Sequence, residues 1–456
     1  MATITGPLSG GAHGWSFAGY FGDIGQRGYL EEEFFCAGTA RRYTPVGVHD
    51  SEGKWAVEAA GEALYKTRIL VKRPKDPSKF NGTVVVEWAN VTLGHELIVV
   101  DLPSIYEGFA HVSVSSQFAG LHGFDTNPMG LIAWDAQRYG SLSHPGDSYS
   151  YDIFTQAGRA VGPQRDRSGI DPMGGLRVRN LIATGASQSG ARMLTYINAI
   201  APKEPVFHAL VPLIIGGWAS GFDDTVLDPN KLFATPPTPE ELAKLMRVST
   251  RIRDDLKVPV MLVNSESETM GCFPCRQPDT GKFRFWEVAG SSHGPQGMTE
   301  LMEQKTKRDG VFVNPFEGAS PSIVMWSPAA DAAIVHVKRW IEGGAPPPRQ
   351  PLIVVAGNSP AIERDEHGIA KGGVRLPDVE VPISSNSGYN AGAGLEALVG
   401  STQPFPREKI RRLYPSHDYY LAKVTAAAKA AREAGVILPI AERDYIQRAK
   451  ASSIPA

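Results

Sequence analysis

The sequence predicts an α/β fold, in which a mostly parallel central sheet is flanked by helices. Short runs rich in β-branched and aromatic residues recur along the first three quarters of the chain, and helical patterns lie between them. Several of these runs are continuously apolar rather than alternating, which is typical of strands that helices bury on both faces. Repeated strand–helix–strand units favour a three-layer α/β domain.

Each predicted strand is a short run bounded by polar residues, glycine or proline. These runs are TRILVKRP (Thr67–Pro74), GTVVVEW (Gly82–Trp88), FAHVSVSS (Phe109–Ser116), VRNLIAT (Val178–Thr184), FHALVPLI (Phe207–Ile214), VPVMLVN (Val258–Asn264) and FRFWEVAG (Phe283–Gly290). Helical patterns are found at about His95–Glu107, Tyr151–Ala160, Ser189–Ala201, Pro239–Leu256, Asp331–Gly344 and Tyr419–Gly435. The last two end in glycine, as helices commonly do.

Two segments do not fit this alternation. Residues 216–257 form a long insertion after a strand, with several aromatic side chains and a TPPTP breaker, and we interpret them as a cap. Residues 346–456 are rich in loops and contain SSNSGYNAGAG before one late helix. We therefore expect a main domain over residues 1–345 and a C-terminal extension over residues 346–456 that wraps and packs on the same domain.

The composition excludes several functional classes. Of 456 residues, 42% are hydrophobic and 21% charged, and the formal net charge is −2 without long runs of one sign. These values indicate a globular protein and give no sign of nucleic-acid or membrane-surface binding. The first residues, MATITGPLSGGAHGWSF, have neither a basic nor an apolar leader segment, and there are only three cysteines. We therefore expect a soluble cytoplasmic protein.

The stretch NLIATGASQSGARMLTYI (Asn180–Ile197) indicates a nucleophilic serine. An apolar run ends at Ala183 and a helical pattern follows at once, with small residues between them. A sharp strand-to-helix turn presents a serine hydroxyl to a base and to oxyanion donors, but it requires small residues two positions before and after that serine. Ser187 has Gly185 and Ser189 at these positions and lies directly past the strand, whereas Ser189 falls inside the first helical turn. The alternative is an ordinary helix-capping serine.

The rest of the chain supplies the partners that such a serine needs. In a hydrolase of this kind an acid and then a histidine follow the serine, each just past a later strand. SESE (Ser265–Glu268) follows VPVMLVN, and AGSSHG, which contains His293, follows FRFWEV. A carboxylate and a histidine thus occupy both expected positions, and this coincidence favours catalysis over capping.

With these motifs, the sequence resembles the α/β-hydrolase superfamily, and within it a group of large bacterial α/β-hydrolase-domain proteins with a G-x-S-Q-S-G nucleophile elbow. The segments that carry the resemblance are TRILVKRP, FNGTVVVEWANVT, YGSLSHPGDSYSYDIFTQAG, GASQSG, WEVAGSSHG and HGIAKGGVRLPDVEVP, over roughly Gly19 to Ala449. The resemblance implies an α/β-hydrolase fold with Ser187 as nucleophile, His293 as base and Glu268 as acid. Ser189 stands where the wider superfamily usually has glycine.

The hypothesis that follows is a serine esterase or lactonase acting on a small molecule. Backbone N–H groups of Gln188 and of Asn90 or Val91, in the loop after the VVVEW strand, are the expected oxyanion donors. No cofactor or metal is expected. The alternatives are an acyltransferase with the same triad and a hydrolase fold that has become a non-catalytic binding protein. Nucleic-acid and membrane partners are not expected, and the oligomeric state stays open, homo-oligomers included.

Weaker indications concern the substrate pocket and one cysteine pair. His95, His122, Trp218 and Phe222 are candidate substrate-binding residues because they lie in loops, near strand ends or in the cap. The motif CFPC, between the predicted acid and base, holds Cys272 and Cys275. A structural zinc site needs four ligands, so we interpret the motif as a brace made either of buried thiols or of a short disulfide.

Overall fold

The computed structural model describes residues 2–224, 249–311, 316, 318–357, 359–392 and 394–455. The chain divides into two compact units. The first comprises Met1–Val260, Cys275–Gln277 and Gln304–Phe312, and the second comprises Met261–Pro274, Pro278–Glu303 and Val313–Ala456. Most of the predicted cap, residues 225–248, lies outside the described residues, as does the first part of the predicted helix Pro239–Leu256. The described remainder of that helix, residues 249–256, is not helical.

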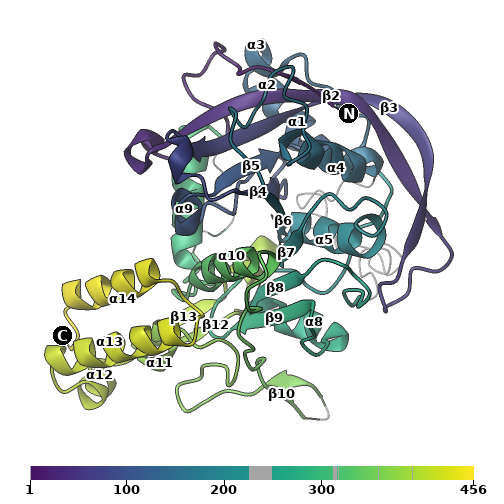
Figure 1. The fold of residues 1–456 in the computed structure, drawn as a ribbon. Coiled ribbons are helices and arrows are strands. Elements are labelled where there is room, and N and C mark those ends of the chain that lie inside the picture. Colours follow the sequence, from purple (N-terminus) through teal and green to yellow (C-terminus); the bar gives the residue numbers. More distant parts are fainter. Residues whose placement is uncertain are drawn as a thin grey trace. The chain divides into compact units, whose positions relative to one another are not determined.

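The first unit is built on a mixed sheet (Figure 1). Its strands pair in the order β1, β2, β3, β5, β4, β6, β7. Their bounds are β1 Thr3–Thr5, β2 Tyr29–Val46, β3 Ala56–Pro74, β4 Thr83–Trp88, β5 Ala110–Val114, β6 Asn180–Ala186 and β7 Ala209–Leu213. The pairs from β1 through β3 to β5 are antiparallel, and those from β5 through β4 and β6 to β7 are parallel. The predicted α/β class is confirmed, and the strands predicted in this unit are present.

A long hairpin was only partly predicted. The segment Thr67–Pro74 is the second half of the 19-residue strand β3, which pairs along its length with the 18-residue strand β2. Figure 1 shows the two strands as long curved ribbons at the start of the chain. The β2 sequence carries a run of three glutamates, which reads as a solvated loop, but Glu33 is buried because it pairs with Arg68. The strand could not be predicted from the local pattern, because the partner of Glu33 lies in another part of the sequence.

The helices of the first unit follow the parallel strands. α5 (Gln188–Thr195) continues into a π-helical turn at Tyr196–Ile200 and packs against β4, β6 and β7, and α4 (Ser150–Val161) packs against β2 and β4. Both confirm predicted helices. The shorter elements are η1 Ile24–Arg27, η2 Pro77–Lys79, η3 Pro103–Tyr106, α1 Phe118–His122, α2 Leu131–Trp134, α3 Ala136–Tyr139 and η4 Asp147–Tyr149.

The predicted helix His95–Glu107 is wrong. Only Pro103–Tyr106 is helical, as a 3-10 turn. Ile98, Val100 and Leu102 are buried while the residues between them are partly exposed. Burial with a period of two is the signature of extended chain, so these apolar residues anchor a loop and do not form a helical stripe.

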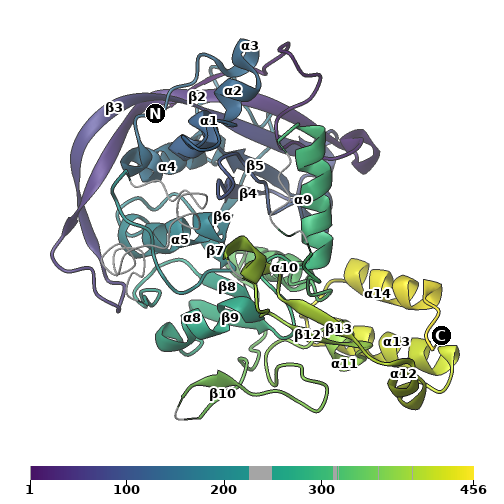
Figure 2. The same ribbon diagram turned by 180° about the vertical axis from the view of Figure 1, so that it is seen from behind.

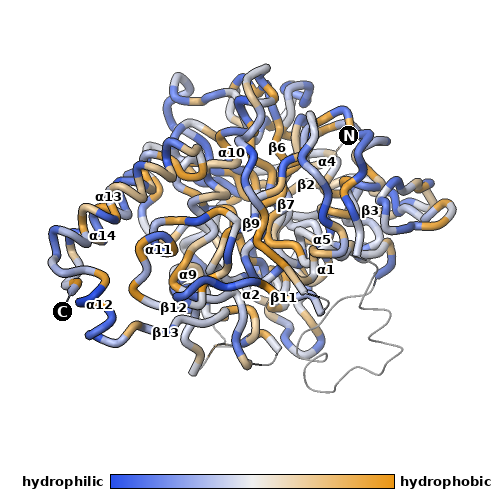
Figure 3. Tube along the Cα trace, turned by 90° about the horizontal axis from the view of Figure 1, so that it is seen from below, coloured by the Kyte–Doolittle hydropathy of each residue, from blue (hydrophilic) through white to orange (hydrophobic). Residues whose placement is uncertain are grey.

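The core of the first unit lies along the central strands. Every residue of β4, β5 and β7 is buried, and the tube in Figure 3 is hydrophobic at β7. Each fully buried large apolar side chain stabilises the fold by about 1.5–3 kcal/mol relative to an exposed one. The polar residues just past the strand ends are therefore held on a rigid base.

The second unit contains two of the predicted strands and the C-terminal part of the chain (Figure 2). β8 (Val260–Ser265) and β9 (Phe283–Val288) are neighbours in the strand order, and all their residues are buried. α10 (Ser327–Ile341) and α13 (His417–Glu433) confirm the last two predicted helices. Its other elements are η6 Glu266–Glu268, α8 Thr269–Cys272, β10 Val355–Ala356, β11 Ala361–Ile362, α11 Pro377–Glu380, β12 Ser384–Ser387, η8 Gly394–Val399, β13 Ser401–Pro404, α12 Arg407–Leu413 and α14 Pro439–Ala451. Two further elements, η7 Phe273–Cys275 and α9 Gln296–Arg308, contain residues assigned to both units.

Candidate active site

Ser187 lies at the turn between β6 and α5. Its backbone has φ 60° and ψ −121°, a conformation that non-glycine residues rarely adopt. The turn is held by the Ser187 N–H, which donates to the Leu213 carbonyl at 3.0 Å. A strained, positive-φ serine between a buried strand and a helix is the backbone geometry of a nucleophile elbow.

The small neighbours of Ser187 are required by close packing. A Cβ on Gly185 would lie 2.9 Å from the Ser189 carbonyl oxygen, and one on Gly190 would lie 2.8 Å from that of Leu213. Ser189 itself is fully buried, and its hydroxyl donates to the Ala186 carbonyl at 2.9 Å and accepts from the Ala186 N–H at 3.0 Å. The Ser189 hydroxyl therefore closes the turn, which is a structural role.

Candidate oxyanion donors lie on both sides of this turn. The Gln188 N–H belongs to the first turn of α5, where backbone N–H groups lack intrahelical partners. In the loop after β4, the Asn90 N–H donates to the Leu97 carbonyl at 3.1 Å, so that group is engaged. Within the described part of the chain, the Val91 N–H makes no hydrogen bond. Between the two predicted candidates, the geometry favours the Val91 N–H as a donor.

The Asn90 side chain fixes this loop to the elbow. Its Nδ2 donates to the Ala186 carbonyl at 2.9 Å, and its Oδ1 accepts from the Thr92 N–H at 2.9 Å. Asn90 is 3% exposed. The amide thus spans from the loop to the residue just before Ser187, which sets the position of Val91 relative to the serine.

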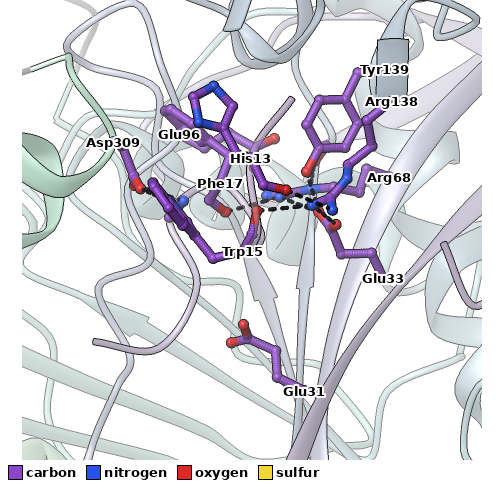
Figure 4. A network of polar contacts seen from close by, with 12 residues as sticks. His13, Trp15, Phe17, Glu31, Glu33, Arg68, Glu96, Arg138, Tyr139 and Asp309 are labelled. Carbon is purple, nitrogen blue, oxygen red and sulfur yellow. Dashed lines mark hydrogen bonds and ion pairs between the residues drawn. The ribbon is translucent and has the colours of Figure 1, made fainter. Parts of the chain in front are cut away.

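A buried network of charged side chains, centred on Arg68, supports the same loop (Figure 4). The Arg68 guanidinium, fully buried, pairs with Glu33 at 2.9 Å and with Glu96 in the loop. Figure 4 shows Arg68, Arg138 and Tyr139 converging on Glu33. Burial raises the pKa of Glu96, although the charge of Arg68 opposes this rise. Sequence reasoning missed the network because its members are far apart in the chain.

A second buried pair supports α5. The Arg192 Nη2 donates to Asp147 Oδ2 at 2.9 Å, and both side chains are almost fully buried. The same carboxylate oxygen accepts from Gln117 Nε2 at 3.3 Å, and Gln117 Oε1 in turn accepts from the Trp88 ring N–H at 3.0 Å. This chain of contacts joins the ends of β4 and β5 to α5, the helix that follows Ser187. The only sequence signal was a run of polar residues, YGSLSHPGDSYS, just before a buried helix.

Glu268 and His293 meet in the second unit. His293 Nδ1 lies 2.6 Å from Glu268 Oε1, and Glu268 is 5% exposed. The other carboxylate oxygen, Oε2, accepts from the Ser265 N–H at 2.9 Å and from the Ser265 hydroxyl at 2.5 Å. The contact from the Ser265 N–H is one half of a capping box at the end of β8, and these contacts leave the other oxygen of Glu268 to face the imidazole.

Glu266 does not contact the histidine ring. Its Oε2 accepts from the Gly290 N–H at 2.8 Å, and its Oε1 accepts from Arg364 Nη2 at 2.8 Å. Of the two carboxylates in SESE, Glu268 is thus the one paired with His293. The carboxylate of Glu266 instead joins the loop that carries His293 to the C-terminal part of the chain.

The four candidate substrate-binding residues lie in different surroundings. His95 is 1% exposed, packs against Phe17, and has a pKa lowered by burial. His122 is half-buried, stacks on Phe118 with ring centroids 4.2 Å apart, and also has a pKa lowered by burial. Phe222 packs against Tyr151, while the backbone of Trp218 forms an isolated antiparallel β-bridge with Ser249. His122, Trp218 and Phe222 are each partly exposed.

The cysteines are free thiols, with Cys36 and Cys272 buried and Cys275 partly exposed. Burial raises the pKa of Cys36 to about 11. Among the described residues, no group of three or more histidine, cysteine or acidic side chains is arranged to hold a metal ion. In the same part of the chain, no helix has the length and apolar character needed to cross a membrane.

The fold and the serine elbow define the class of protein, that of α/β hydrolases. The chain belongs to the family described as "Alpha/beta hydrolase domain", whose model matches residues 4–447. No curated protein matches the chain.

Solved structures with a similar arrangement include several hydrolases. Acetyl xylan esterase 1 from Thermoanaerobacterium sp. JW/SL YS485 is 12% identical over 68% of this chain and 88% of its own, with a TM-score of 0.29. An esterase from the archaeon Pyrobaculum calidifontis is 14% identical over 54% and 78%, with a TM-score of 0.28. A serine hydrolase without a lid from Xanthomonas campestris is 10% identical over 59% and 94%, with a TM-score of 0.30.

Proposed function

We propose that the protein is a serine hydrolase that cleaves carboxylic esters or lactones through Ser187, His293 and Glu268. The observation that carries the proposal is the positive-φ conformation of Ser187 at the turn from β6 to α5. The 2.6 Å contact between His293 and Glu268, which follow β9 and β8 respectively, supports it. Membership of the α/β-hydrolase family agrees with this chemistry.

The reaction has two halves. The neutral imidazole of His293 takes the Ser187 hydroxyl proton while the oxygen attacks the acyl carbon, and the oxyanion is held by the N–H groups of Gln188 and Val91. Collapse expels the alcohol, which receives the proton from the imidazolium, and leaves an acyl-serine ester. A water molecule, deprotonated by the same imidazole, then attacks this ester and releases the acid. Throughout, the carboxylate of Glu268 fixes the imidazole tautomer and stabilises the imidazolium.

The proposal is tested by release of p-nitrophenol from short acyl esters, together with labelling by a fluorophosphonate probe. Ser187→Ala should lower kcat by about 10³-fold or more and abolish labelling, because the nucleophile is lost. Ser189→Ala is the matched control. It removes a buried hydroxyl that closes the turn, so it should cost about 1–2 kcal/mol of stability and far less activity. Labelling that maps to Ser189, or a wild-type protein that turns over no ester or lactone, would contradict the proposal. Products formed only when an alcohol acceptor is added would identify an acyltransferase.

A further inference from the structure

The C-terminal part of the second unit forms backbone hydrogen bonds with strand β9, next to the loop that carries His293. The Val374 N–H donates to the Glu287 carbonyl at 2.7 Å, and the Ala289 N–H donates back to the Val374 carbonyl at 3.0 Å. The Glu287 carboxylate also accepts from the Ile353 N–H at 2.9 Å. A Cβ on Gly373 would lie 2.8 Å from the Glu287 carbonyl oxygen, so the two backbones are in close contact. Residues far along the chain thus continue the sheet edge where β9 ends and the His293 loop begins.

A buried ion pair joins this region to the same loop. Glu266 is fully buried, and both of its oxygens are occupied. Oε2 receives the Gly290 N–H at 2.8 Å, while Oε1 receives Arg364 Nη2 at 2.8 Å and the Ser387 hydroxyl at 3.2 Å. A buried carboxylate left without its cation is costly, so Arg364 is needed to hold Glu266 in place. Glu266 in turn fixes the backbone three residues before His293.

A hydroxyl bridge joins the base itself to the C-terminal segment. The Ser267 hydroxyl accepts from the His293 N–H at 2.9 Å and donates to the Gly388 carbonyl at 2.6 Å. A Cβ on Gly388 would lie 2.5 Å from the Ser267 backbone nitrogen, so only glycine allows this approach. The Tyr389 hydroxyl donates to the Ser267 carbonyl at 3.1 Å. The turn that carries Glu268 and the backbone of His293 are therefore held by the same few residues.

We propose that Arg364 and Gly388 are positioning residues for the Glu268–His293 pair. They hold the turn that carries Glu268 and the loop that carries His293 in fixed positions relative to each other, so that the 2.6 Å contact between the two side chains persists. Neither residue touches the reacting atoms. The inference rests on the proposed function for its catalytic meaning, but its structural content concerns the acid–base pair alone.

The test uses the full-length chain with Arg364→Ala, Arg364→Lys and Gly388→Ala. Arg375→Ala is the matched control for the arginine, because Arg375 is similarly exposed. It binds Asp365, Glu380 and the Ala370 carbonyl, and none of these lies in the segments that carry Glu268 and His293. Gly281→Ala is the control for the glycine, because nothing lies within 4 Å of a Cβ added there.

Two readouts separate positioning from general destabilisation. Arg364→Ala and Gly388→Ala should lower kcat at least about tenfold with KM changed less than about threefold, and Arg364→Lys should recover part of the loss. Both controls should stay within about twofold of the wild type. The second readout needs no substrate: the NMR resonance of the His293 Nδ1 proton, assigned by its absence in His293→Ala, should be shifted or lost in the two variants and kept in the controls.

The outcomes are distinguishable from those of the proposed function. An unchanged Nδ1 resonance and near-normal kcat in folded Arg364→Ala and Gly388→Ala would overturn the positioning role. If the wild type hydrolyses no ester while the resonance still responds as expected, the proposed function fails and the positioning role stands. Should Arg364→Ala not fold, Arg364→Lys and Gly388→Ala carry the same comparison.

Discussion

Replacing Glu268 by glutamine should be unusually damaging, and the structure explains why. The oxygen Oε2 of Glu268 accepts from the Ser265 N–H at 2.9 Å, and a backbone N–H can only donate. In the Glu268→Gln variant the amide oxygen must therefore take this position, and the NH₂ group faces His293 Nδ1. An NH₂ group can only donate to Nδ1, so the imidazole proton is forced onto Nε2. An imidazole protonated on Nε2 cannot accept a proton there from the serine.

The expected loss in kcat is about 10³- to 10⁴-fold, the size seen when a triad histidine is held in the wrong tautomer. This corresponds to about 4–5.5 kcal/mol of transition-state stabilisation. Glu268→Ala also removes the negative charge but leaves the imidazole free to choose its tautomer, so it should be no slower than Glu268→Gln. Glu266→Gln should lose only about tenfold, because it disturbs the support of the loop and leaves the His293 partner intact.

The assay is turnover of p-nitrophenyl acetate at neutral pH, with the folded fraction of each variant measured by circular dichroism. The reasoning is refuted if Glu268→Gln keeps more than about a tenth of the wild-type kcat, or if it clearly exceeds Glu268→Ala. A larger loss in Glu266→Gln than in Glu268→Gln would reverse the assignment of the acid.

Three further predictions concern the surroundings of the site. Asn90→Ala removes the amide that ties the loop after β4 to the elbow, so kcat should fall about 10- to 100-fold with little change in KM, measured by steady-state kinetics. Exhaustive dialysis against EDTA should leave activity intact, and a loss of activity that zinc restores would contradict the interpretation of the cysteine pair as a brace. A Cys272→Ser/Cys275→Ser double variant should show a clear loss of activity with only a small change in melting temperature. Burial raises the pKa of Tyr389 to about 12, so the stability that its neutral hydroxyl provides should be present below pH 10 and lost as the pH rises toward 12. Urea unfolding across this range should show the stability difference between wild type and Tyr389→Phe shrinking with pH, since the donor to the Ser267 carbonyl is then removed in both.

The strands that build the sheet were predictable because their apolar runs are continuous. Such runs have no alternative but burial, so local pattern and global fold agree there. One of the failures involves long-range charge pairing. Glu33 is buried with Arg68 and Arg138 paired to its carboxylate, and no local pattern reveals these partners. The strand β2 was therefore missed. The loop that begins at His95 was mistaken for a helix for another reason, because its apolar residues are buried alternately, as in extended chain.

The candidate site shows a similar division. The strand-to-helix turn at Ser187 was visible because small residues crowd a sharp turn. The orientation of Glu268 also had a local signal, since Ser265 and Glu268 form the S-x-x-E pattern of a capping box. In contrast, Arg364 is 98 residues from Glu266, and its contact with the base loop could not be inferred from either segment alone.

That sequence separation also orders events during synthesis. A ribosome must add residues 294–388 after His293 before the Gly388 carbonyl can accept a hydrogen bond from the Ser267 hydroxyl. At the usual 5–20 residues per second, this interval lasts about 5–20 s. During this interval the nascent chain already carries Ser187, yet the turn of Glu268 and the loop of His293 lack the residues that hold them. Hydrolytic competence should consequently be acquired late, and a chain that stalls or is cut before Gly388 should remain a poor catalyst.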